Sequence, residues 1–299
     1  MKQYTSLYFV GAGGIGMSAL VRYFLAKGYK VAGYDRTQSP LTTELKTEGL
    51  EIVYEESVES IPDYCRNPET TLVVYTPAIP ASHAGLVYFR EHGFRVVKRA
   101  ELLGLITQSS RGLCFAGTHG KTTTSSMAAH IFHESPIGCN AFLGGILRNY
   151  NSNLILSEQS PFTVIEADEY DRSFHWLHPY MAVVTATDPD HLDIYGTEEA
   201  YLESFAHFTS LIQPGGCLIM KKGIRLVPNV KEGVKIYTYS ARDGGDFHAG
   251  NIRIGDGTIV FDFVTPEGVF ADIELGVPVE INIENAVAAM AIAWLNGVS

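Results

Sequence analysis

The first hundred residues alternate between short apolar runs and longer amphipathic stretches. Runs rich in β-branched and aromatic residues predict strands at Leu7–Val10, Lys30–Tyr34, Thr71–Tyr75 and Arg95–Val97. Segments of helix length separate or follow these strands at Ile15–Lys27, Leu41–Glu48, Ala84–His92 and Ala100–Thr107. Strands that alternate with helices in this way favour a parallel sheet with helices on both faces.

A second series of the same kind follows the polar residues Gln108–Arg111, where we place a domain boundary. Its pattern predicts strands at Gly112–Ala116, Phe162–Ile165, Met181–Thr185 and Cys217–Met220, and a helix at Thr122–His133. Period-two alternation on both sides of Gly255-Asp256-Gly257 predicts a β-hairpin over Phe247–Ile254 and Thr258–Val264. The alanine-rich segment Asn282–Leu295 is predicted as a helix.

These elements predict an α/β protein with two doubly wound domains, residues 1–108 and 109–299, the second with an added β-hairpin region. The length of 299 residues is sufficient for two domains. Hydrophobic residues make up 46% and charged residues 18%, which is typical of a globular chain. The formal net charge of −11 argues against a general nucleic-acid binder, because such proteins usually present a basic surface.

The cysteines and the apolar runs indicate the cellular compartment in which the protein is expected. The four cysteines form no CxxC pair, which argues against a disulfide framework and against a structural zinc site. The first residues lead directly into a strand and no apolar run approaches 18 residues, so we expect neither a signal peptide nor a membrane span. We therefore expect a cytoplasmic protein with reduced thiols, and the sequence does not indicate its oligomeric state.

A glycine-rich loop, Gly11-Ala12-Gly13-Gly14-Ile15-Gly16, joins the first predicted strand to the first predicted helix. Its glycines allow the backbone to approach a pyrophosphate, and the helix N-terminus offers unpaired N–H groups. Asp35 ends the next strand, where an acidic residue can bind a ribose hydroxyl. The pattern predicts a Rossmann-like domain for a diphosphate-containing nucleotide. It leaves open NAD, a UDP-sugar, or a tight turn without a ligand.

A second phosphate loop, Gly117–Thr124 with the sequence GTHGKTTT, also connects a strand to a helix. Lys121 is placed to bind nucleotide phosphates, and the hydroxyl of Thr122 can reach a magnesium ion. The general motif has a glycine five residues before Gly120, but Phe115 occupies that position, so the loop is shortened. We predict a P-loop ATP-binding domain, with a structural turn as the alternative.

Acidic side chains follow two further strands of the second series, in Glu166–Asp171 and Asp188–Asp193. Ligands gather outside the carboxyl ends of parallel strands, so both segments are expected to face Lys121. Carboxylates there could hold Mg²⁺ that bridges ATP phosphates. His191 is a weaker candidate than Glu166, because Mg²⁺ prefers oxygen. The alternative is that these carboxylates cap helices or stay solvated.

Two phosphate loops in one chain favour an enzyme that uses ATP on a nucleotide-linked substrate. Two hypotheses from other classes stay open on the residues alone. One is a nicotinamide-dependent oxidoreductase that uses only the first loop. The other is a nucleotide-binding module without enzymatic activity.

Together these motifs resemble those of the Mur ligases, ATP-dependent ligases of peptidoglycan precursor synthesis, over essentially the whole chain. The segments that carry the resemblance are Tyr8–Gly16 with Met17-Ser18, Gly33–Asp35, Thr76–Ile79, Lys98–Glu101, Ala116–Thr124, Glu166–Asp171 with Ser173-Phe174, Asp190–Asp193 and Asn282–Ala286. The shortened loop is the form that this family carries, and combined with Glu-Ala-Asp-Glu it is a specific signal. Within the family the chain resembles the ligases that join L-alanine to UDP-N-acetylmuramate, with a murein-tripeptide ligase as the alternative.

The resemblance implies binding roles for residues of both loops. The first loop with Asp35, Thr76 and Asn151 would bind UDP-N-acetylmuramate, and the Gly144-Gly145 turn with Asn153 would lie near the muramoyl group. The residues that would bind ATP are Gly117, Thr118, His119, Gly120, Lys121, Thr122, Thr123, Asn282 and Asn285. The resemblance also implies catalytic roles for Lys121, Glu166 and His191, and Mg²⁺ ligation by Thr122, Glu166 and His191.

The chain departs from the family pattern at three places. The usual His-Asn-x-x-Asn near adenine begins with Ile281, and Ala186 replaces a usual asparagine. The stretch 197–214 contains no lysine, so the carbamylated lysine that several siblings use for a second metal is not available from it.

The resemblance further implies an acyl-phosphate mechanism and a third domain that helps to build the L-alanine site. We expect that domain to be absent from this chain, and therefore expect nucleotides to bind without appreciable ligation.

Overall fold

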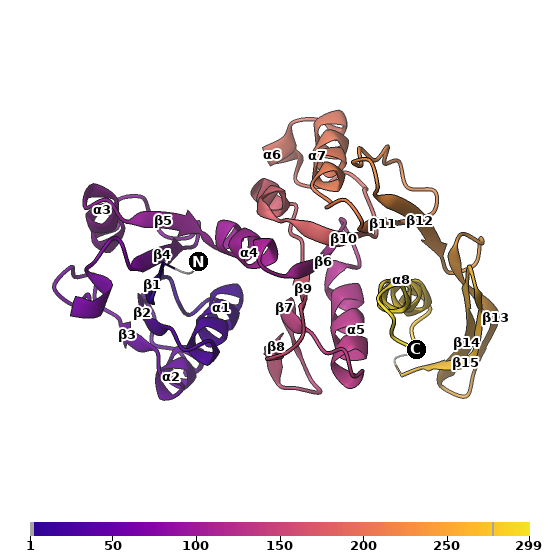
Figure 1. Cartoon of the computed structure of the whole chain (residues 1–299), viewed down its shortest axis with the longest axis horizontal. Coiled ribbons are helices and arrows are strands. Elements are labelled where there is room, and N and C mark those ends of the chain that lie inside the picture. The colour runs from indigo at the N-terminus through magenta and orange to yellow at the C-terminus, as the bar shows by residue number, and fades with distance from the viewer. Residues whose placement is uncertain (1–2, 277) are drawn as a thin grey trace. The chain divides into compact units, whose positions relative to one another are not determined.

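The computed structural model describes residues 3–276 and 278–299 and divides them into two compact units (Figure 1). The first unit comprises residues 1–106 and 144–154, and the second comprises residues 107–143 and 155–299. The predicted boundary at 108/109 is close to the first of these divisions. The prediction did not include the second segment of the first unit, residues 144–154, which lies within the sequence of the second domain.

The first unit is built on a five-stranded parallel sheet in the order β3-β2-β1-β4-β5. Its strands are β1 (Ser6–Val10), β2 (Lys30–Tyr34), β3 (Glu51–Val53), β4 (Thr71–Tyr75) and β5 (Arg95–Lys98). Its helices are α1 (Ile15–Ala26), α2 (Pro40–Thr47), α3 (Ala84–Glu91) and α4 (Arg99–Gln108), with a 3₁₀ turn at Asp63–Cys65. The central strand β1 is buried at every residue, as its apolar sequence requires.

Gly33 allows β2 to lie close against β1 at the end that carries the first loop. A Cβ at this position would lie 2.6 Å from the carbonyl oxygen of Phe9, its register partner, and 3.3 Å from Cβ of Ala12. Real Cβ atoms do not approach backbone oxygens so closely, so a side chain here would push the two strands apart. The glycine therefore sets the position of the loop that follows β1.

The second sheet has ten strands in the order β15-β14-β13-β12-β11-β10-β6-β9-β7-β8. Its strands are β6 (Arg111–Ala116), β7 (Asn140–Leu147), β8 (Ser152–Ile155), β9 (Phe162–Glu166), β10 (Pro179–Val184), β11 (Cys217–Lys221), β12 (Lys235–Ser240), β13 (Phe247–Gly255), β14 (Thr258–Thr265) and β15 (Gly268–Leu275). The helical segments are α5 (Lys121–Glu134), the 3₁₀ segment η2 (Tyr170–Trp176), α6 (Leu192–Tyr195), α7 (Glu198–Ser210) and α8 (Ile281–Leu295). Strands β6, β9, β10, β11 and β12 pair in parallel, so their carboxyl ends form one edge.

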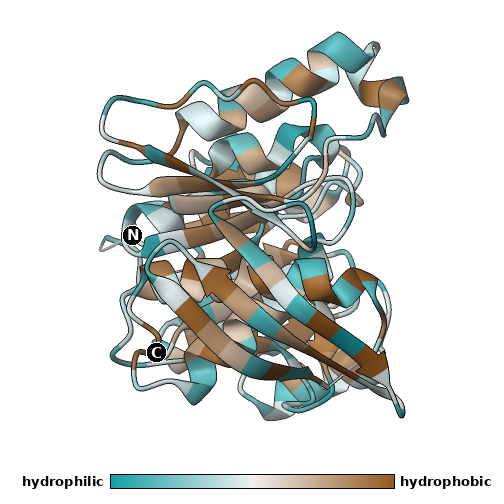
Figure 2. Cartoon of the chain, turned by 90° about the vertical axis from the view of Figure 1, so that its right-hand side faces the viewer, coloured by the Kyte–Doolittle hydropathy of each residue, from teal (hydrophilic) through white to brown (hydrophobic). Residues whose placement is uncertain are grey.

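The predicted hairpin is part of a three-stranded antiparallel extension, β13-β14-β15, joined to the parallel sheet through β12. Figure 2 shows alternating hydrophilic and hydrophobic residues along these strands. In β14 the inward side chains Ile259, Phe261 and Phe263 are buried while their neighbours are more exposed. Helix α8 packs against β12 and β13, and its alanines allow a close approach (Figure 1).

The α/β architecture and the main predicted strands and helices are confirmed. The predicted turn at Gly144-Gly145 is wrong, because both glycines lie inside β7. The hairpin prediction was incomplete, since β15 adds a third strand beside β14. Period-two patterning was weak in β15, where most residues are exposed, and this explains why the strand was not predicted.

We expect Gly33→Ala to lower the free energy of unfolding by about 1–3 kcal/mol, because the added methyl group overpacks the β1–β2 contact. Gly255→Ala is the matched control, since no atom lies within 4 Å of its Cβ position and its φ is not positive. Thermal and urea unfolding of both variants measure the difference. Equal stabilities would contradict the steric role assigned to Gly33.

Candidate functional site

The first glycine loop is held by the end of β2. The carbonyl oxygen of Tyr34 accepts hydrogen bonds from the N–H groups of Gly11 and Ala12, at 2.8 and 3.0 Å. The N–H of Gly13 donates to Asp35 Oδ2 at 2.7 Å. Three consecutive N–H groups of the loop are thus already used within the fold. The N–H groups of Ile15 and Gly16, at the start of α1, have no intrahelical acceptor.

Asp35 therefore has a structural contact as well as its predicted ligand role. One carboxylate oxygen binds Gly13 N, and the other accepts from Thr37 N at 3.0 Å. Each carboxylate oxygen has a second lone pair, so a ribose hydroxyl can still be accommodated. The side chain both shapes the loop and lies at the edge where the ligand is expected.

Other residues of the first unit fill the space around this loop. A Cβ at Gly11 would lie 2.7 Å from Thr76 Cγ2, and one at Gly16 would lie 2.9 Å from Arg99 Nη1. Asn153 is buried and donates from Nδ2 to the carbonyl oxygen of Ile15 at 2.8 Å. Asn151 is exposed and has a left-handed backbone. Thr76 and Asn153 thus lie at the loop, and Arg99 adds a guanidinium beside α1 that was not predicted.

The second loop is fixed by Thr185, the residue after β10. Its N–H donates to Ala116 O at 3.0 Å, and its hydroxyl donates to His119 O while lying 3.2 Å from Ala116 O. A Cβ at Gly117 would lie 2.2 Å from Thr185 Oγ1, so only glycine fits here. Gly120 has φ +85° and precedes the first residue of α5. These contacts and the positive φ of Gly120 hold the loop in one backbone conformation, a cradle around the start of α5.

Lys121 points into this cradle. Its Nζ lies 2.6 Å from Gly117 O and 2.9 and 2.8 Å from the two carboxylate oxygens of Glu169. Glu169 is 1% exposed, and within the described residues its Oε2 accepts no hydrogen bond although the Lys121 ammonium lies 2.8 Å away. Burial raises the pKa of the Glu169 carboxyl, and the Lys121 ammonium opposes that shift.

Thr118 anchors the other side of the loop. Its hydroxyl lies 2.7 Å from Asp188 O and 2.8 Å from the hydroxyl of the fully buried Tyr201. Burial raises the pKa of Tyr201, which keeps its hydroxyl protonated. These contacts connect the loop to α7 and to the segment after β10. They leave the exposed His119 and Thr123 on the open side of the loop.

Two of the three predicted metal ligands are in contact. Thr122 Oγ1 donates to Glu166 Oε1 at 2.9 Å, which brings two oxygen donors together at the carboxyl ends of β6 and β9. His191 has φ +53°, packs edge-on against Tyr170 and lies 3.7 Å from Asp190. No group of three His, Cys, Asp or Glu side chains forms a complete metal site in residues 3–276 and 278–299. The oxygen pair suits Mg²⁺, which keeps several waters and takes further ligands from phosphates.

Of the two asparagines at the start of α8, Asn285 contacts the second loop and Asn282 does so through Asn285. Asn285 Oδ1 accepts from Thr124 Oγ1 at 3.2 Å and would lie 2.9 Å from a Cβ at Gly120. Its Nδ2 donates to Asn282 Oδ1 at 3.1 Å. Asn285 is buried and positions the loop, whereas Asn282 is more exposed. Ile281, just before these asparagines, is exposed.

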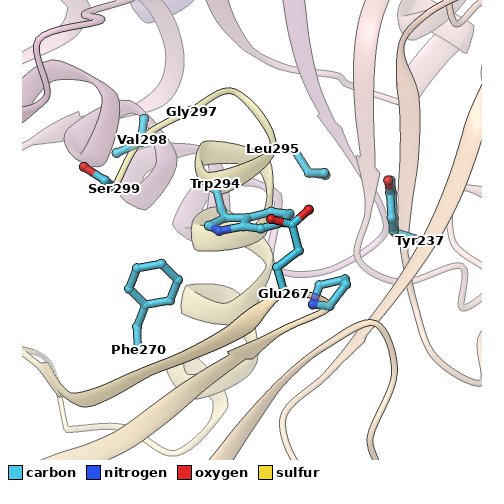
Figure 3. A pocket seen from close by; sticks show the side chains of 9 residues that line it. Tyr237, Glu267, Phe270, Trp294, Leu295, Gly297, Val298 and Ser299 are labelled. Atoms are coloured by element: carbon cyan, nitrogen blue, oxygen red, sulfur yellow. The ribbon is translucent and has the colours of Figure 1, made fainter.

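A surface cavity lies at the far end of α8 (Figure 3). It is lined by Trp294, Leu295, Phe270 and Glu267 among others. Trp294 comes nine positions after Asn285, which is about 14 Å along a helix. The cavity is therefore distinct from the loop that contains Lys121.

Sequence reasoning missed three residues that shape these sites: Glu169, Thr185 and Arg99. Glu169 stands in the quoted Glu-Ala-Asp-Glu segment, but only Glu166 was given a role. Arg99 stands in the quoted Lys-Arg-Ala-Glu segment in the same way. A signal existed for Glu169, because an acidic residue beside a buried strand end needs a cationic partner. Thr185 gave no signal of its own, because its role depends on strand order.

Two family models together match most of the chain. The Mur ligase middle domain matches residues 115–293, and the Mur ligase family, catalytic domain, matches residues 6–111. A UDP-N-acetylmuramate–L-alanine ligase from Parabacteroides distasonis is 68% identical over 298 residues, covering 100% of this chain and 64% of the relative. One from Phocaeicola vulgatus is 65% identical, covering 98% of this chain and 64% of the relative.

Solved structures share the fold. The UDP-N-acetylmuramate:L-alanyl-γ-D-glutamyl-meso-diaminopimelate ligase from Neisseria meningitides has a TM-score of 0.83 at 21% identity, covering 99% of this chain and 94% of that chain. The UDP-N-acetylmuramate–alanine ligase from Thermotoga maritima has a TM-score of 0.80 at 24% identity, covering 98% and 65%. The chain spans about 64% of the length of the curated relatives it matches. On the identities and the two family models, the chain belongs to the Mur ligase family.

Proposed function

We propose that this chain provides the two nucleotide-binding units of an ATP-dependent ligase that joins L-alanine to the carboxylate of UDP-N-acetylmuramate in peptidoglycan precursor synthesis. The observation that carries the proposal is the presence of two separate phosphate loops, each built at the carboxyl edge of its own parallel sheet. Relatives of that name at 68 and 65% identity support the choice of substrates. The cytoplasm, where ATP is available, is the proposed location. No helix in the described part of the chain is long and apolar enough to cross a membrane.

The chemistry needs activation of a carboxylate, because hydroxide is a poor leaving group at neutral pH. In the proposed reaction the muramoyl carboxylate attacks the γ-phosphate of ATP, which gives an acyl phosphate and ADP. The amine of L-alanine then attacks the acyl carbon and phosphate leaves as the amide bond forms. Such a sequence depends mainly on positioning and on neutralising charge.

The residues of the second loop have distinct parts in this proposal. Lys121 and the N–H groups at the start of α5 neutralise the phosphates. Thr122 and Glu166, with His191 after a side-chain movement, would hold Mg²⁺. That ion would supply a positive charge to the transferred phosphoryl group. Asn285 and Thr185 keep the loop in shape.

The first unit is proposed to bind the UDP part of the sugar nucleotide. The free N–H groups of Ile15 and Gly16 would bind the diphosphate, with Asp35 on the ribose. Thr76 and Asn151 are the further proposed contacts. L-alanine has no assigned residues in this proposal.

A titration with two ligands tests the proposed function. We expect UDP-N-acetylmuramate to bind the chain that is already saturated with a magnesium complex of a non-hydrolysable ATP analogue, because the two loops are separate. Isothermal calorimetry in both orders of addition measures this, with NADH as the comparison ligand. Tight NADH binding without UDP-N-acetylmuramate binding would instead favour an oxidoreductase.

We expect Lys121→Ala to weaken binding of the magnesium–ATP analogue about 10- to 100-fold, the effect of losing a charged hydrogen bond. The same change leaves the buried Glu169 carboxylate without a cationic partner, so thermal stability also falls. Lys222→Ala is the control, since this lysine is exposed and its ammonium donates to Asp243 O, away from the loop. Calorimetry and thermal unfolding of both variants measure the two effects. Unchanged affinity of Lys121→Ala for the ATP analogue would contradict the role of Lys121 in phosphate binding.

We expect Asp35→Ala to weaken binding of UDP-N-acetylmuramate by about tenfold or more, because Gly13 N loses a charged acceptor and the loop loses its shape. Asp35→Asn keeps an acceptor for Gly13 and should retain more affinity. Both variants should bind the ATP analogue like the wild type. Sugar-nucleotide titrations measure the ranking, and identical affinities in all three chains would contradict it.

A further inference from the structure

The ammonium of Lys121 is held by two hydrogen bonds and by the full charge of Glu169. It donates to Gly117 O at 2.6 Å and to Glu169 Oε1 at 2.9 Å, and its Nζ lies 2.8 Å from Glu169 Oε2, which accepts no hydrogen bond within the described residues. A lysine has three N–H donors, so one donor remains for a phosphate. A phosphate that binds to Lys121 must therefore share the ammonium with the buried carboxylate or draw it away.

Glu169 is unable to follow the lysine toward a ligand. It is 1% exposed, and its backbone carbonyl accepts from the buried hydroxyl of Tyr195 and from Arg172 N at 3.0 Å. Asp171 and Arg172 then take left-handed backbone conformations, which turn the chain back over this residue. The carboxylate is thus a fixed negative charge at the base of the cradle.

We propose that Glu169 is a positioning residue that competes with nucleotide phosphates for Lys121. Without nucleotide it holds the ammonium inside the loop, and a bound polyphosphate has to draw that ammonium away or share it. The proposal rests on the proposed function of the second loop as an ATP site. It adds that the ligand must present a phosphate group able to compete with a buried carboxylate.

The competition has a consequence for product release. When ADP leaves, Glu169 recaptures Lys121, so the empty loop keeps its ion pair instead of an isolated ammonium. The affinity for ADP is therefore lower than it would be in a loop that has Lys121 but no negative charge at position 169. Removing the negative charge of Glu169 should make ADP bind more tightly, which is opposite to the effect of damaging a purely structural contact.

The test is calorimetry of ADP with Glu169→Gln, at one fixed excess of Mg²⁺. We expect ADP to bind at least about fivefold more tightly to Glu169→Gln than to the wild type, a gain of about 1 kcal/mol. Asp168→Asn is the matched control. It removes a neighbouring charge whose Oδ1 accepts from Tyr170 N, and Asn keeps that acceptor. The control should stay within about twofold of the wild type.

Unchanged or weaker ADP binding by a folded Glu169→Gln chain would overturn the proposal. So would an equal gain in Asp168→Asn, because that result would show a general charge effect. If thermal unfolding shows that Glu169→Gln does not fold, Glu169→Ser replaces it, since its short side chain leaves room for water beside the ammonium; the same gain is expected. If the wild-type chain binds no ADP, the proposed function of the second loop as a nucleotide site is itself contradicted.

Discussion

The parallel register of β6 with its two neighbours is the constraint on which the second site depends. Phe115 is opposite Glu166 in β9, and Ala116 is opposite Val184 in β10. One residue further on, Gly117 therefore lies against Thr185. Glu166, the last residue of β9, lies beside Thr122. A shift of this pairing by one residue would reverse every side chain of the strand and separate these groups.

The two loops are stabilised by the same principle with different residues. In each, the strand end next to the loop makes hydrogen bonds to loop groups. Tyr34 O and the Asp35 carboxylate accept from the first loop, whereas the Thr185 hydroxyl donates to His119 O and Ala186 O accepts from Thr118 N in the second. In each, a glycine is required because a neighbouring side chain occupies the place of its Cβ. The glycines thus reflect packing inside the protein as much as access for a ligand.

Much of the fold was predictable because its signals are local. Periodicity located β1, β2, β4 and α5 to within one residue at either end, and the glycine loops located both sites at strand ends. Strand order was not predictable, because the pairing of β6 between β9 and β10 leaves no trace in local sequence. For that reason Lys121 could be assigned to phosphate, but its partner Glu169, 48 residues away, was missed. The Gly144-Gly145 turn failed because paired glycines favour turns in general, whereas here they belong to an edge region of a sheet.

Asp171, Arg172 and His191 have left-handed backbone and lie close in sequence to the candidate residues of the second site. Each such conformation costs on the order of 1 kcal/mol and persists only where surrounding contacts hold it. Phe174 is buried against Phe205 and Phe208, and its N–H binds Asp168 O, so the chain must reverse tightly after Glu169. The reversal leaves the Glu169 carboxylate buried beside Lys121, while Asp171 and Arg172 are exposed and the Arg172 guanidinium lies over the ring of Tyr195. Backbone strain and a buried ion pair are therefore two parts of one arrangement: the first fixes the carboxylate, and the second fixes the lysine.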